Sequence, residues 1–206
     1  FNRYTSRDVY TLSVAGSAVQ RMATRPALTA VSQPGLVTAT ETIEQNAVYM
    51  PQCACGSLPA GRDGDRWAWE DLRLPGRPSV TLPFTLTGVV ANQTASLTVW
   101  LISYTTLAAN PDHRLTLSVN GSSLGTVDWD GRQAITQTVS VPANVLISGG
   151  NNLTLTLPGL PNVMPEGTWL DAFQVSYVSS GGDTRATVVS ENAERLNSVT
   201  LSTTSG

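Results

Sequence analysis

The chain has 206 residues, 41% of them hydrophobic, which is long enough for one domain with a sizeable core. Charged residues make up 13% of it, the net charge is −3, and every basic residue is an arginine. The sequence has no basic patch interleaved with aromatic side chains, which would predict a nucleic-acid partner. It also has no run of 18 apolar residues, which would predict a membrane span. Low charge and abundant Thr and Ser favour an exported protein, secreted or held at the cell surface. No signal-peptide pattern follows Phe1, so we expect a processed product or a piece of a longer protein.

The first 50 residues contain two stretches that alternate between apolar and polar side chains. Residues 1–35 are expected to form an N-terminal strand arm, with strands around Gly16 in residues 8–22 and a Pro- and Gly-containing loop in residues 24–35. Residues 36–50 alternate again and are rich in Thr, which predicts the first strand of the main domain.

Residues 51–78 form the longest irregular stretch, with prolines and glycines throughout. We expect a long loop, because loops of this length are usually functional or packed against the domain. Inside it, Trp67 and Trp69 lie two residues apart, so an extended backbone would place both rings on one face. A helical turn would instead pair Trp69 with Leu72.

The remaining strands follow from period-two alternation. Residues 79–89 and 94–105 predict two strands, and the second is apolar on both faces, which indicates a central strand. The alternation is cleanest in residues 112–177, where the dipeptide Asn120-Gly121 predicts a hairpin turn. These patterns predict an all-β antiparallel β-sandwich or jelly roll over residues 36–179. Residues 180–206 are expected to form a Gly-rich linker and a C-terminal strand arm, with strands at 184–190 and 199–203.

Thiols and the single histidine offer little catalytic chemistry. A disulfide between Cys53 and Cys55 would close a very small, strained ring, and free thiols are the alternative. His113 is in phase with the apolar positions of its strand, which favours a half-buried structural histidine paired with Asp112. A Cys–His dyad using Cys53 or Cys55 stays open as the alternative. One histidine cannot complete the usual zinc ligand set.

Acidic residues suggest a calcium site. Asp63 and Asp65 lie in a Gly-containing loop, where oxygen ligands for calcium are commonly found, although the spacing is not that of an EF-hand. Solvated turn residues are the alternative. Asp171 is expected on the same strand face as Trp169, Phe173 and Val175, where a carboxylate needs a partner or a ligand. We therefore predict possible structural calcium at Asp63, Asp65 and Asp171.

Aromatic residues suggest glycan binding. Trp67 and Trp69, in the long loop, and Trp129, between two aspartates, are the candidates for a stacking platform, whereas Trp100 and Trp169 are expected in the core. Three Asn-x-Ser/Thr sequons begin at Asn92, Asn120 and Asn152. Their first interpretation is turn residues, and glycan attachment is the second.

Several motifs together resemble a known module. The segments DVYTLSVAG, DRWAWEDL, DHRLTLSVNGSSLGTVDWDG, VPANVLISGGNNLTLTLPG and TWLDAFQVSY are similar to a β-sandwich module that precedes the catalytic domain in gingipain-like cysteine peptidases of exported bacterial proteins. The resemblance covers most of residues 8–178. The same pattern is similar to galactose-binding-like and carbohydrate-binding modules, whose last strand often carries an acid like Asp171, sometimes near calcium. No segment resembles the peptidase catalytic domain, so the resemblance implies a non-catalytic module.

Three functions follow as expectations. The first is a non-enzymatic module of a gingipain-like, peptidase-type exported protein that packs against adjoining domains or binds a ligand. The second is a subunit of an extracellular filament or surface layer, in which terminal arms add strands to neighbouring copies. The third is a carbohydrate-binding module that uses Trp67, Trp69 or Trp129.

Overall fold

The computed structural model describes residues 36–51 and 58–180, and these residues form strands and loops without a helix. The strands are β1 (Val37–Glu44), β2 (Val48–Tyr49), β3 (Trp67–Ala68), β4 (Glu70–Leu74), β5 (Ser79–Leu86), β6 (Ala95–Ser103), β7 (His113–Val119), β8 (Ser122–Trp129), β9 (Ala134–Val141), β10 (Gly149–Thr156) and β11 (Glu166–Ser179). No element of this part of the chain has the length and apolarity of a membrane-crossing helix. The expected terminal arms, residues 1–35 and 181–206, and the two cysteines lie outside the described residues.

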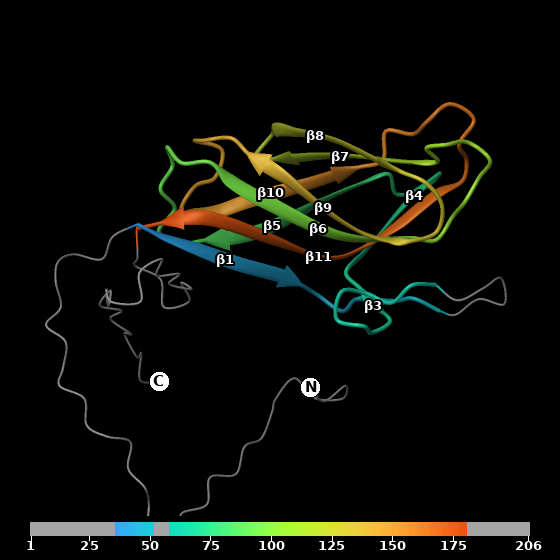
Figure 1. Ribbon diagram of the computed structural model, residues 1–206, viewed down its shortest axis with the longest axis horizontal. Helices are drawn as coiled ribbons and strands as arrows, with labels where there is room; N and C mark the ends of the chain where they lie inside the picture. Colours follow the sequence, from blue (N-terminus) through green and yellow to red (C-terminus); the bar gives the residue numbers. More distant parts are fainter. Residues whose placement is uncertain (1–35, 52–57, 181–206) are drawn as a thin grey trace, which may run out of the picture.

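Two antiparallel sheets pack face to face as a β-sandwich, which confirms the predicted fold class (Figure 1). The larger sheet has the order β1-β11-β6-β9, with β4 also paired to β11. We call it the flap sheet, after the flap that the chain forms between β1 and β4. The smaller sheet has the order β5-β10-β7-β8. The predicted central position of residues 94–105 is confirmed, because β6 has β11 on one side and β9 on the other.

The core lies between the sheets and is built from the alternate residues of each strand. In β5 and β7 the burial alternates strictly, as the period-two pattern requires. Phe173 of β11 links the layers: its ring stacks on Trp69 at 5.6 Å and meets Phe84 of β5 edge-on at 5.3 Å. Burying one such ring contributes about 1.5–3 kcal/mol.

The hairpin between β7 and β8 has its turn at Asn120-Gly121, as the sequence predicts. Val119 pairs with Ser122, which leaves Asn120 and Gly121 as a two-residue loop with φ of 51° and 80°. Both values are left-handed, a conformation that Asn and Gly adopt at lower cost than other residues. Asn120 therefore acts as a turn residue.

The expectation of one long loop in residues 51–78 was wrong. The segment contains β3 and β4, and β4 pairs with the start of β11 from Leu74 opposite Glu166 to Glu70 opposite Leu170. Local sequence favours a loop here, but hydrogen bonding to the β11 edge overrides that preference.

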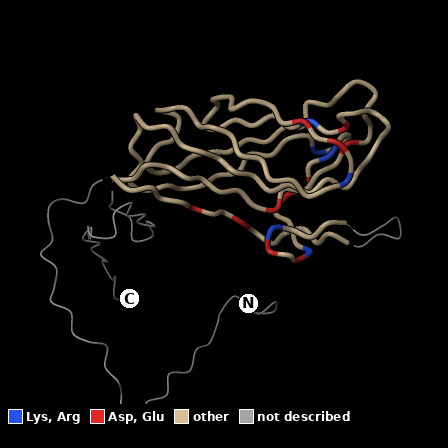
Figure 2. The backbone as a smooth tube through the Cα atoms, in the orientation of Figure 1, with Lys and Arg blue, Asp and Glu red and all other residues tan. Residues whose placement is uncertain are grey.

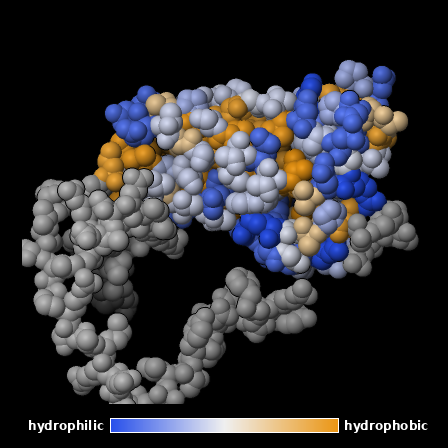
Figure 3. Space-filling model, in the orientation of Figure 1, coloured by the Kyte–Doolittle hydropathy of each residue, from blue (hydrophilic) through white to orange (hydrophobic). Residues whose placement is uncertain are grey.

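Charge is unevenly distributed over the sandwich. Figure 2 shows the charged residues of the described part gathered toward one end of the sandwich and the loop beneath it. Strands β5, β6, β9 and β10 carry no charged side chain. In Figure 3 that loop region is largely hydrophilic, whereas hydrophobic colour shows at the opposite tip, where β1 begins and β11 ends.

Candidate binding site under the flap

A β-bulge at Asp171 interrupts the last strand. Leu170 pairs with Leu101, but the next pair along β6 joins Trp100 to Ala172, so Asp171 is an extra residue without a partner on β6. An extra residue reverses the alternation of the strand beyond it. Leu170 and Phe173 therefore both face the core, although they are three residues apart.

The bulge overturns the expected face of Asp171. Trp169 packs in a second hydrophobic cluster outside the main core, whereas Phe173 and Val175 belong to the core. Asp171 lines a pocket with Trp100 on the outer side of the flap sheet. The prediction of one shared face for these residues failed because it assumed unbroken period-two alternation, which the extra residue of the bulge interrupts.

The chain between β1 and β4 forms a flap at this point, described over residues 45–51 and 58–69. β1 pairs with β11 up to Ala172, and β4 pairs with β11 from Leu170 backward, so both strands occupy the same edge and meet at Asp171. The flap leaves the sheet there and contains the small β2–β3 sheet. Figure 1 shows it as the loop below one end of the sandwich.

A second small core holds the flap against the flap sheet. Met50, Leu58 and Ala68 of the flap pack on Ile102 and Trp169. Tyr104 adds an aromatic contact, with its ring 4.2 Å from that of Trp169, and its hydroxyl donates to Asp71 Oδ1 at 2.7 Å. Burial is the main cause that raises the pKa of Tyr104, so this hydroxyl stays protonated as a donor. These contacts fix the base of the flap.

Asp171 holds the flap at Gly61 and Arg62. The Arg62 amide donates to Asp171 Oδ2 at 2.6 Å, and the adjacent Gly61 comes so close that a Cβ there would lie 2.6 Å from Oδ1. Asp171 is 2% exposed. Burial raises the pKa of this carboxyl to about 6, and the charges of Asp63 and Glu44 add to the effect, while Arg62 opposes it.

A pocket of about 190 Å³ opens between the flap and the flap sheet. Asp171, Trp100, Arg62 and Thr136 contribute its polar and aromatic lining. The Arg62 guanidinium lies 5.2 Å from the centre of the Trp100 ring and forms an ion pair with Glu44. Such a pocket, with an aromatic wall and a buried carboxylate, suits a small polar ligand.

The small β2–β3 sheet of the flap carries an exposed aromatic pair. Tyr49 of β2 and Trp67 of β3 are 56% and 42% exposed, and their rings meet edge-on with centroids 5.3 Å apart. The two residues are direct cross-strand partners. Sequence analysis selected Trp67 but missed Tyr49, whose partner on β3 could not be known without the strand pairing.

The other two predicted platform tryptophans are buried. Trp69 sits at a bend between β3 and β4, which turns its ring away from the Trp67 side and into the core. Trp129 stacks on His113 at 5.0 Å, inside the sandwich. The three rings therefore do not form one surface, and of the three Trp67 is the one that solvent reaches.

The predicted calcium ligands accept hydrogen bonds from backbone amides of the flap. Asp63 Oδ1 accepts a hydrogen bond from the Asp65 amide at 3.0 Å, and Asp65 Oδ1 accepts one from the Trp67 amide at 2.7 Å. Within residues 36–51 and 58–180, no group of three His, Cys, Asp or Glu residues is placed to hold a metal ion. Calcium at Asp63, Asp65 and Asp171 thus stays a prediction from the sequence.

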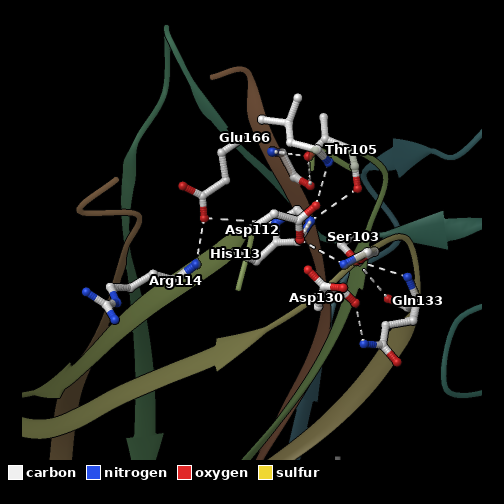
Figure 4. Close-up of polar contacts among 11 residues, drawn as sticks. Ser103, Thr105, Asp112, His113, Arg114, Asp130, Gln133 and Glu166 are labelled. Atoms are coloured by element: carbon white, nitrogen blue, oxygen red, sulfur yellow. Dashed lines mark hydrogen bonds and ion pairs between the residues drawn. The ribbon is translucent and has the colours of Figure 1, made fainter. Parts of the chain in front are cut away.

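A separate polar cluster around His113 is sealed inside the sandwich (Figure 4). His113 Nε2 lies 3.2 Å from the Thr105 carbonyl oxygen, which can only accept, so Nε2 carries the proton. Asp112 accepts hydrogen bonds from the amides of Leu107 and Gly131. Glu166 Oε1 accepts from the Arg114 amide at 2.8 Å and lies 3.9 Å from His113 Nδ1.

This cluster is structural rather than catalytic in its geometry. Burial is the main cause that lowers the pKa of His113 and raises the pKa of Glu166, so it works against the charged form of each group. His113 is fully buried, more than the sequence suggests, and lies near Asp112 as expected. The Cys–His alternative involves cysteines outside the described residues.

Comparison with known proteins adds information on fold. No protein-family model matches the chain, and no curated protein matches it. Among solved structures, dimeric latent PorU from Porphyromonas gingivalis is similar, with a TM-score of 0.54 and 16% identity over 73% of this chain. The aligned part is 13% of the PorU chain, so this chain spans about an eighth of that protein.

Two carbohydrate-binding modules are more distant. One is a CBM36 module in complex with calcium and xylotriose, with a TM-score of 0.36 and 14% identity, covering 66% of this chain and 98% of that chain. The other is the CBM36-1 domain of a multidomain xylanase from the hindgut metagenome of Trinervitermes trinervoides, with a TM-score of 0.37 and 14% identity, covering 68% and 96%. At these scores the two modules support no functional argument. The similarity to PorU shows a shared β-sandwich fold.

Proposed function

We propose that this chain is a non-catalytic β-sandwich module of a larger, exported, gingipain-like protein, and that it binds glycans through the flap. The observation that carries the proposal is the exposed pair of Tyr49 and Trp67. Two aromatic rings that remain partly in solvent on a small, fixed sheet offer the stacking surface that sugar rings use. The edge-on contact between the rings limits their rotation, which lowers the entropy lost on binding.

The arrangement of the flap supports a binding role. The base of the flap is fixed by its own hydrophobic cluster, and the loop carboxylates of Asp63 and Asp65 hold its backbone amides. A binding surface held on a rigid scaffold needs little reorganisation when a ligand arrives. The candidate general base, His113, is sealed in the core, which supports a module without catalysis.

A glycan panel titrated against the protein, with tryptophan fluorescence as the readout, tests the proposal. We expect at least one glycan to shift the emission, and Trp67→Ala to weaken that binding by about two- to tenfold, since stacking on one ring contributes about 0.5–1.5 kcal/mol. Trp129→Phe is the matched control, because it removes a buried indole that no glycan reaches. A wild-type protein silent across the panel would overturn glycan binding.

A second candidate, a subunit that assembles by strand addition, is favoured by the outer edge of β9, with which no other described strand pairs. Natural edge strands usually carry a charge, a proline or an irregularity that discourages pairing. In the described sandwich, β1 has Glu41, β4 has charged residues, β5 has Pro83, and β8 has Asp128 and an irregular pairing opposite Leu117. β9 is eight residues long and has none of these features.

The proposed donor for this edge is the predicted strand at residues 184–190 of a second copy. We expect light scattering of the full chain to show oligomers that grow with concentration. Thr138→Lys, a charge on the exposed face of β9, should return the protein to a monomer, whereas Thr81→Lys on the proline-protected β5 edge should not. A monomer at every concentration would rule out this assembly.

A further inference from the structure

The pocket beneath the flap holds a carboxylate, Asp171, that no side-chain cation of the described residues pairs with directly. Asp171 accepts the Arg62 backbone amide at one oxygen, but the Arg62 guanidinium pairs with Glu44 and lies over Trp100. The cation nearest to Asp171 is therefore already shared with another acid.

Among the described charged groups that act on Asp171, Arg62 is the one cation, and Arg66 of the flap donates instead to the Leu58 carbonyl oxygen. From the flap, Arg62 and Asp63 act on Asp171, and from β1, Glu44 does. In β4, Glu70 is held by an ion pair with Arg77. Strands β6 and β9, which form the floor and the far wall, contain no ionisable side chain. The pocket thus has three acids near one guanidinium, a balance that attracts a cation.

The remaining walls restrict which cation fits. Ile102, Ala134 and Ile135 line one side with apolar atoms, and the indole of Trp100 lies beside them. The Asp171 carboxylate attracts an ammonium group by its charge, and the apolar walls suit the methylene groups that follow it. The volume of about 190 Å³ is below the 300–1,000 Å³ typical of pockets for larger ligands, so it suits a side-chain-sized group.

We propose that this pocket binds a primary alkylammonium group, as found at the end of a lysine side chain or in a small free amine. The ammonium pairs with the Asp171 carboxylate, and its methylene chain lies against the apolar wall. The chain itself contains no lysine, so no lysine of its own competes for the pocket. The site is distinct from the Tyr49–Trp67 pair and goes beyond glycan binding.

The site has a built-in dependence on pH. Asp171 must be ionised to attract the cation, and its pKa of about 6 means that it gains a proton as the pH falls below neutrality. Affinity should therefore fall about tenfold between pH 7.5 and pH 5.0, since most molecules carry a neutral Asp171 at the lower value.

Titration of the full chain with n-butylamine, followed by NMR of the tryptophan indole signals at pH 7.5, tests the proposal. We expect saturable shifts of the Trp100 signal, a loss of affinity of at least tenfold in Asp171→Asn, and no response to the uncharged 1-butanol. Ala134→Phe, an exposed position at the pocket mouth, should block binding without touching the carboxylate. Nα-acetyl-lysine methylamide in place of butylamine tells a protein-borne lysine from a free amine.

Controls separate this site from the glycan surface. Trp67→Ala should bind butylamine as the wild type does, and Asp128→Asn, on the other sheet, should also leave affinity unchanged. Equal binding by Asp171→Asn or by butanol would overturn the proposal, as would the absence of a saturable shift in the wild type. Glycan binding can fail while the amine titration succeeds, and the reverse also holds.

Discussion

At the scale of single residues, Asp171 shows how burial and charge decide the behaviour of a side chain. Its carboxyl is nearly inaccessible to solvent, and the hydrogen bond that it accepts from Arg62 comes from the backbone amide. An ionised carboxylate in such a place is costly unless a partner compensates it. The sequence marked Asp171 as chemically unusual, but for the wrong face of the strand.

The raised pKa of Asp171 predicts that Asp171→Asn stabilises the fold at neutral pH. The folded-state pKa is about 6, above the roughly 3.9 of an unfolded chain, so the native state binds the proton more tightly. The stability that this proton adds is present below pH 4 and is lost as the pH rises through 6. The asparagine keeps an oxygen for the Arg62 amide and has no charge to bury.

We therefore expect Asp171→Asn to have the larger free energy of unfolding at pH 7, by about 1–3 kcal/mol. The two proteins should converge near pH 4. Urea unfolding from pH 4 to pH 8 measures the difference. A variant that is less stable than the wild type at pH 7 would show that the carboxylate has a compensating partner.

At the scale of elements, β11 organises the flap sheet and positions the flap. Its 14 residues pair with β6 on one edge and with β4 and then β1 on the other. The bulge at Asp171 lies between the part of β11 that pairs with β4 and the part that pairs with β1. The flap therefore leaves the sheet beside the residue that accepts a hydrogen bond from its Arg62 amide. Periodicity predicted β11 as a strand, but not its bulge or its three partners.

Position 167 of β11 has room for glycine but for no residue with a Cβ atom. A Cβ at this position would overlap the ring of Tyr104, which Asp71 and Trp169 hold in place. We expect Gly167→Ala to cost about 1–3 kcal/mol, because the ring cannot move aside without losing these contacts.

Gly150→Ala in β10 is the matched control. Gly150 is an exposed strand glycine, and a methyl group added to it would meet no atom within 4 Å, so the change should stay within about 0.5 kcal/mol. Thermal unfolding of both variants measures the difference. Equal melting temperatures would contradict the tight approach of Tyr104.

At the scale of the whole molecule, one core joins the two sheets, and a smaller cluster attaches the flap outside it. The main cluster draws on both sheets, whereas the second holds residues of the flap, β6 and β11. Phe173 lies at the centre of the first, between Trp69 and Phe84. The sandwich and the flap therefore depend on different sets of side chains.

Phe173→Ala should destabilise the whole sandwich. Removal of a buried aromatic ring that contacts both sheets leaves a cavity and typically costs about 3–5 kcal/mol. Near-ultraviolet circular dichroism and urea unfolding should report one shared transition at lower denaturant. Ser140→Ala, an exposed position on β9, is the control and should leave the midpoint unchanged. A two-step transition in the variant would mean that the sheets unfold separately.

The sequence by itself determined the class of fold and most of its strands. Alternation of apolar and polar residues is a local property, so it marks half-buried strands without knowledge of their partners. It also placed β6 in the centre of a sheet and the Asn120-Gly121 turn between β7 and β8. Trp67 and Asp171, two members of the candidate site, were selected from the sequence as well.

Only the tertiary structure decided how these residues come together. The pairing of β4 and β1 along one edge of β11 joins residues 92 to 142 positions apart, and no local pattern encodes it. That pairing places Arg62 against Asp171 and leaves Tyr49 beside Trp67, while a bend buries Trp69. Long-range hydrogen bonding and packing, rather than the preferences of single residues, determine which side chains line the pocket and which remain exposed.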